Sequence, residues 1–196
     1  MDKFEGSYTR KAADLRDESY RKAIPQMPES QRQHMFDVQR HARREERKNF
    51  YINCWHMNHY ESAAMWELYG VTGQSVAIQS TYRTLERILP RNLSDTGNPQ
   101  EGHVDIGIVR YLDYDQDLMP QIYTFDPFLR KRASFSHENE ARLFLQRENA
   151  SKGFSKFGDG PVEPITEEDN IQEGINVDVD LEKLIQKVYV SPDSGI

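Results

Sequence analysis

The chain changes character at Phe50, and this change constrains the fold more than any other feature. Before it, residues 8–49 are polar and helical in pattern, with prolines that divide them into two segments. After it, short strand-like runs alternate with short helical runs, without the regular strand–helix–strand rhythm of a doubly wound sheet. The sequence therefore predicts one α+β domain, 1–196, with a helical arm at 1–49 and, at 50–196, a core of mixed or antiparallel sheet and short helices.

The core contains several segments with a clear period. Ala141, Leu143 and Leu145 alternate with Glu140, Arg142, Phe144 and Gln146, which predicts a strand with one buried face. The helix expected at 63–69 is apolar on most sides, so we expect it to be buried, with a capping box at its start and Gly70 at its end. Further strands are expected at 50–55, 75–79, 104–114, 175–179 and 187–191, short helical segments at 81–89, 125–131 and 181–186, and loops at 91–103 and 149–172.

Composition excludes several classes of protein. The 9 Phe, 10 Tyr and 2 Trp are too many aromatic residues for a disordered chain. No apolar run approaches the roughly 18 residues of a membrane-spanning helix, and the first residues do not form a secretory signal. The only cysteine, Cys54, excludes a disulfide framework and a zinc ribbon. We therefore expect a cytoplasmic protein without membrane attachment, and the net charge of −7 argues against a general nucleic-acid surface.

The most informative stretch runs from His137 to Arg142. Glu140 and Arg142 lie on one face of the expected strand, and Glu138 shares that parity or sits in the entering loop. Two carboxylates beside an arginine can be held in different electrostatic states, which serves acid–base chemistry or the grip of a ribose. The simpler interpretation stays open: surface ion pairs at a strand edge, in which Lys131 or Arg132 joins Glu140 and Arg142.

Three blocks of residues, in this order and spacing, resemble the uncharacterised domain-of-unknown-function family 2971. The blocks are 53–58 running into 61–69, the pair 76–78 and 109–111, and 131–142. Residues 2–6 look like an early turn of that family, with Lys3 in place of its proline, and 188–192 look like a late strand. The resemblance implies two further strands before this turn and a helical segment after Pro192. The family name supplies no activity.

The Glu-x-Glu at Glu138 and Glu140 resembles the catalytic element of ADP-ribosyltransferases. This resemblance implies NAD as a substrate, and the partner expected is a protein or nucleotide substrate. It implies that Glu140 is catalytic, binding the nicotinamide ribose and stabilising an oxocarbenium-like state, and that Glu138 orients the acceptor. The residues expected to shape the pocket around them are Arg142, Lys131, Trp66, Tyr69 and His56.

Two further functional hypotheses compete with this one. In the first, the chain is a non-catalytic binding or regulatory domain whose contact surface combines the arginine-rich segment 40–48 with Trp66 and Tyr69. In the second, it is a nuclease in which Asp113 and Asp115 join the two glutamates around a magnesium ion. The place of the usual nuclease lysine is taken by Arg142, which stays protonated and transfers protons poorly.

A last candidate is the run Cys54-x-His56-x-x-His59, which offers three metal-ligand types within six residues. The strand end and the helix start on which they lie need not converge. We favour a structural interpretation, with Cys54 buried, Trp55 in the core and His56 hydrogen-bonded to the backbone. A nucleophilic role of Cys54 is disfavoured because an apolar strand would raise the pKa of its thiol. The sequence predicts no metal site and no cofactor beyond NAD.

Overall fold

The computed structural model describes residues 6–47, 50–70, 74–90, 102–119, 125–147 and 174–192. Helices and antiparallel sheets combine in it, which confirms the α+β class. The loop expected at 149–172 and the turn expected at 2–6 lie outside these residues except for Gly6, as does nearly all of the loop expected at 91–103.

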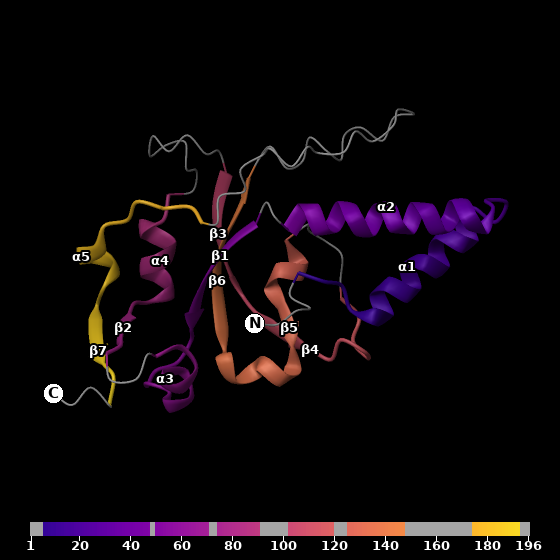
Figure 1. The fold of residues 1–196 in the computed structure, drawn as a ribbon. Helices are drawn as coiled ribbons and strands as arrows, with labels where there is room; N and C mark the ends of the chain where they lie inside the picture. The colour runs from indigo at the N-terminus through magenta and orange to yellow at the C-terminus, as the bar shows by residue number, and fades with distance from the viewer. Residues whose placement is uncertain are drawn as a thin grey trace.

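The N-terminal arm is a hairpin of two helices, α1 (Arg10–Ala23) and α2 (Glu29–Arg47), which extends to one side of the sheets (Figure 1). Thr9 caps α1, its hydroxyl accepting a hydrogen bond from the backbone N–H of Ala12 at 3.3 Å. Tyr20 and Phe36 join the helices through an edge-to-face ring contact. The two helices divided near the prolines are therefore confirmed.

The central sheet is antiparallel, in the order β1 (Phe50–His56), β6 (Glu140–Arg147), β3 (Gly102–Ile108). β6 is flanked by β1 and β3, and its side chains are buried on both faces of the sheet from Glu140 to Leu145. On one face Leu143 packs with Leu85 of α4 (Tyr82–Ile88) and Leu184 of α5 (Leu181–Leu184), as the alternating pattern predicted. The expected short helices at 81–89 and 181–186 are thus confirmed in shortened form.

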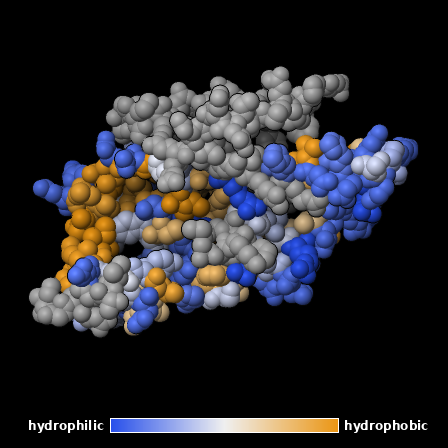
Figure 2. All heavy atoms as spheres, viewed as in Figure 1, coloured by the Kyte–Doolittle hydropathy of each residue, from blue (hydrophilic) through white to orange (hydrophobic). Residues whose placement is uncertain are grey.

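Two small sheets flank this core. β2 (Val76–Gln79) pairs antiparallel with β7 (Lys187–Val190), and β4 (Arg110–Leu112) pairs parallel with β5 (Arg130–Arg132). The 3₁₀ helices η2 (Asp126–Leu129) and η3 (Ala133–Glu138) surround β5. Figure 2 shows apolar side chains gathered over the β2–β7 side, where the exposed residues are Val76, Ile78, Leu181, Val188 and Val190.

Two expected strands need correction. The strand expected at 104–114 is divided at Val109, because β3 ends on β6 and the chain then turns to pair with β5 instead. Residues 175–179 form no strand, and Val179 packs against the Leu143 cluster without a ladder partner. In both places, tertiary packing decides what the local pattern leaves ambiguous.

The helix α3 (Ala63–Tyr69) is formed as expected and ends at Gly70, but the prediction that it is buried is wrong. None of its residues is buried, and Tyr69 is 66% exposed. Its N-cap is Ser62 rather than Asn58, and the Glu61 carboxylate accepts a hydrogen bond from the Trp66 indole. Met65, Trp66 and Tyr69 of α3 form one wall of an open cleft instead of entering the core.

Membrane-spanning helices are not found in the described part of the chain, since none of its helices is both long and apolar enough.

Candidate functional site

The Glu-x-Glu segment forms the turn between η3 and β6. Glu138 ends the 3₁₀ helix, Glu140 begins the strand, and Asn139 between them has a left-handed backbone with φ 38°. The Asn139 side-chain amide donates to the carbonyl oxygen of Met57, and the Met57 N–H donates to the Asn139 carbonyl oxygen at 2.7 Å. These bonds hold the turn against Met57, the residue that follows β1. They therefore fix the backbone positions of Glu138 and Glu140.

Both carboxylates belong to one buried network of charges. The Lys131 ammonium contacts the Glu138 carboxylate and lies 3.4 Å from Oε2 of Glu140. Arg142 binds Glu140 in two places, Nε to Oε1 at 2.8 Å and Nη2 to Oε2 at 3.0 Å, and its third nitrogen donates to the Phe128 carbonyl oxygen. Arg142 is 0% exposed. Two cations thus offset two anions away from water.

The pairing of Glu140 with Arg142 and Lys131 was expected, but its placement on the surface was not correct. β6 is the central strand of its sheet, not an edge. The face that carries Glu140 and Arg142 is covered by η2 and β5, which supply the Phe128 carbonyl and the Lys131 side chain. Alternation alone cannot reveal this cover, because it comes from segments distant in sequence.

The network determines the ionisation of Glu140. Burial raises the pKa of this carboxyl, but hydrogen bonds from Arg142 and from the Cys54 thiol, with the charges of Arg142 and Lys131, outweigh it and leave the pKa below its ordinary value. Glu140 is therefore an anion at neutral pH. Cys54 itself is exposed, so the expectation that it is buried is wrong.

Three further side chains form hydrogen bonds with Glu138 or Glu140. His56 Nδ1 donates to the Glu138 carbonyl oxygen at 2.5 Å, which confirms its expected bond to backbone. The Tyr69 hydroxyl donates to Glu138 Oε1 at 3.4 Å, and Tyr111, which the sequence interpretation missed, accepts from the Glu140 N–H at 2.9 Å. Burial is the main cause that raises the pKa of both tyrosines. Only the position of Tyr111 in one of the resembling blocks could have suggested it.

A cleft of about 440 Å³ opens beside this pair, between the end of β1, α3 and β2. Lys131 and Arg142 do not line it and lie behind the carboxylates. The predicted site residues that line it are Glu138, Glu140, His56, Trp66 and Tyr69. The structure therefore brings the predicted residues together, with five at the surface of the cleft and two supporting them. Trp55 also lines the cleft while it packs against the core, as expected.

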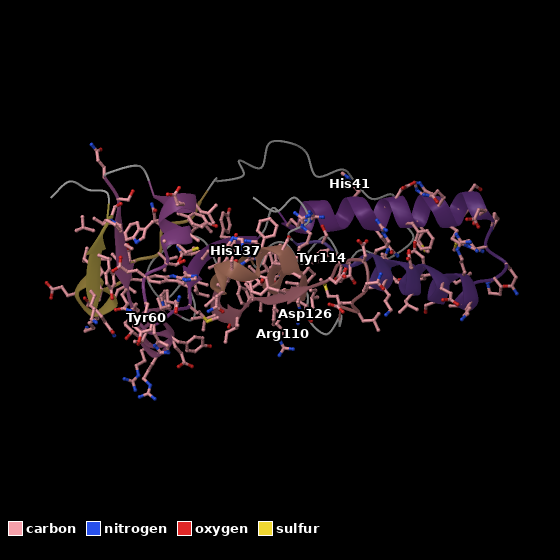
Figure 3. The ribbon with its side chains drawn as sticks, turned by 90° about the horizontal axis from the view of Figure 1, so that it is seen from below. His41, Tyr60, Arg110, Tyr114, Asp126 and His137 are labelled. Carbon is pink, nitrogen blue, oxygen red and sulfur yellow. The ribbon has the colours of Figure 1, made fainter. Side chains whose placement is uncertain are left out.

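Sequence reasoning missed other residues of this cleft. Tyr60 and Glu61 come from the segment before α3, and Tyr189 comes from β7. In Figure 3 Tyr60 lies on the side of the molecule opposite the arm helices, away from Arg110, Tyr114 and Asp126. Tyr60 is a single aromatic residue in a polar stretch, so its sequence neighbourhood carries no signal of a site.

The structure does not assemble the residues of the two metal hypotheses. Asp113 accepts hydrogen bonds from the backbone of its own turn, and Asp115 pairs with Arg10 of the arm at 3.2 Å. Across the described residues, no three His, Cys, Asp or Glu side chains are close enough to hold a metal ion. For segment 40–48, the backbone is helical to Arg47, and most of its side chains lie outside what the structure describes.

Comparison of the chain with protein-family models, with curated proteins and with solved structures finds no match. The resemblance to family 2971 stays a prediction.

Proposed function

We propose that this protein is a cytoplasmic ADP-ribosyltransferase-like enzyme that uses NAD, and that it is related to family 2971. The observation that carries the proposal is the arrangement of Glu138 and Glu140. Both are buried and fixed by cations from behind, and both line a cleft with aromatic walls. Aromatic faces suit the planar nicotinamide ring, and carboxylate oxygens suit the ribose hydroxyls.

The two carboxylates take different roles in this proposal. The bond between the ribose C1′ and the nicotinamide nitrogen breaks, and nicotinamide leaves with the electron pair. Glu140, which its partners keep ionised, stabilises the positive charge that develops on the ribose. The acceptor then attacks C1′, and its proton passes to Glu138, which Lys131 and Tyr69 orient.

Nicotinamide release from NAD, measured with the 1–196 chain in the presence and in the absence of an acceptor, tests the proposal. Glu138→Gln should lower the rate of transfer to an acceptor by roughly two to three powers of ten. Glu67→Gln is the matched control, because Glu67 is exposed on α3 and does not line the cleft. A thermal melt of each variant separates loss of chemistry from loss of fold. Absence of both NAD turnover and NAD binding in the unaltered protein would reject the proposal.

The second candidate function is a non-catalytic binding domain. It is favoured by the exposed aromatic residues at the cleft, Tyr60 at 82% and Tyr69 at 66% exposure, because exposed rings are common in recognition surfaces. This candidate predicts that a ligand binds the cleft and leaves unchanged, so binding without any turnover in the same assays would select it.

A further inference from the structure

The charged side chains that line the cleft, among the described residues, are all acidic. Glu61, Glu138 and Glu140 line it, whereas no lysine or arginine is found among its described lining residues. The cations Lys131 and Arg142 contact the same carboxylates from behind. The buried network is neutral in total, but it is a dipole whose negative end faces the cleft. An anionic group would meet carboxylates there, and a cation would be attracted.

The aromatic wall has the same preference. α3 presents Trp66 and Tyr69 one turn apart, and each ring gives its polar hydrogen to a carboxylate: the Trp66 indole to Glu61 at 3.2 Å and the Tyr69 hydroxyl to Glu138 at 3.4 Å. A donor bound to an anion leaves its ring richer in electrons. The ring faces attract cations through their quadrupoles, tryptophan most strongly.

We infer that the cleft is a binding site for an organic cation, such as a quaternary ammonium or a pyridinium group. The charge lies against the faces of Trp66 and Tyr69, and Glu61 and Glu138 supply the opposite charge. This inference goes beyond the proposed function, because it requires neither NAD nor a transfer reaction. It specifies the charge of the ligand and not a reaction that the ligand undergoes.

Two probes of equal shape test the inference. Choline carries a permanent positive charge, and 3,3-dimethylbutan-1-ol is its neutral isostere. Binding is measured by titration calorimetry and by protection of Cys54 from alkylation, because the chain has no other cysteine and Cys54 lines the cleft. We expect choline to bind at least about tenfold more tightly than the neutral isostere. Equal binding of the two probes, or no binding of choline, would overturn the inference.

Variants locate the cation. Trp66→Leu should weaken choline binding about tenfold, and Glu61→Gln should weaken it several-fold. Tyr69→Leu is a second ring variant that keeps the test valid if Trp66→Leu does not fold, since Tyr69 is largely exposed. Glu67→Gln should bind choline like the unaltered chain. Loss of binding in Glu67→Gln as large as in Glu61→Gln would contradict the assignment to this cleft.

The two proposals fail separately. Choline binding without NAD turnover and without NAD binding supports the cation site and rejects the transferase. NAD turnover without choline binding supports the transferase and rejects the cation site. Comparing the binding of 1-methylnicotinamide, which has a pyridinium ring, with that of neutral nicotinamide repeats the test.

Discussion

At the scale of residues, Glu140 links the stability of the protein to the pH. Its pKa is lowered in the folded protein: burial opposes ionisation, and Arg142, Cys54 and Lys131 more than compensate. The unfolded chain therefore binds a proton to this group at a higher pH than the folded protein does. Stability that comes from Glu140 is fully present above the unfolded pKa of about 4.3. It is lost as pH falls through the lower folded pKa.

We therefore predict that the free energy of unfolding falls as the pH is lowered below about 5, and that Glu140→Gln reduces this dependence. The glutamine keeps the shape of the side chain and has no proton to gain, but its NH2 group cannot accept one of the two hydrogen bonds that Arg142 donates to Glu140. Urea unfolding at a series of pH values measures the effect. If the slopes of Glu140→Gln and the unaltered chain agree below pH 5, other carboxyls dominate the acid response.

At the scale of elements, the turn between η3 and β6 sets the geometry of the pair. Asn139 has φ 38°, a conformation that asparagine and glycine tolerate and alanine resists. Asn139→Ala should cost about 1–3 kcal/mol, from backbone strain and the lost bond to Met57. Asn139→Gly removes the same bond without the strain, so it should be less destabilising. Chemical unfolding of both variants checks the order, and a more stable Ala than Gly variant would contradict it.

Elements with a strong local period could be predicted from the sequence. The two arm helices, the alternating strand that became β6, and the short strands β2 and β7 follow from apolar spacing, prolines and caps. The exposure of α3 could not be predicted. An apolar short helix has the same pattern in a core as along a cleft, and its neighbours in space come from distant parts of the chain.

The same distinction applies to the site. The identities of the paired charges follow from their spacing on one strand, since Glu140 and Arg142 share a face. Their burial depends on η2 and β5, and the cleft depends on β2 and β7, which lie far away in sequence. Single rim residues such as Tyr60 carry no period at all. The sequence thus indicates which side chains meet, and the tertiary fold decides whether they meet water.

At the scale of the whole molecule, the sheets differ in how fully their strands are paired. β6 has a neighbour on each side, and its two registers together cover Glu140–Arg147. β2 and β7, among the described strands, pair only with each other, and one face of this ribbon exposes Val76, Val188 and Val190. Two-stranded ribbons are marginal by themselves, so the molecule should open locally at β2–β7 before the central sheet unfolds.

Amide hydrogen exchange measures this order. Amides of β6 should exchange at the rate of global unfolding, and those of β2 and β7 at least about tenfold faster, because their opening exposes few buried groups. Added urea separates the two classes: exchange through global unfolding accelerates steeply with urea, whereas exchange through local opening responds weakly. The α4 amides serve as an internal reference, since Leu85 belongs to the same buried cluster as Leu143. Equal rates and equal urea dependence in β7 and β6 would show instead that the ribbon and the central sheet unfold as one cooperative unit.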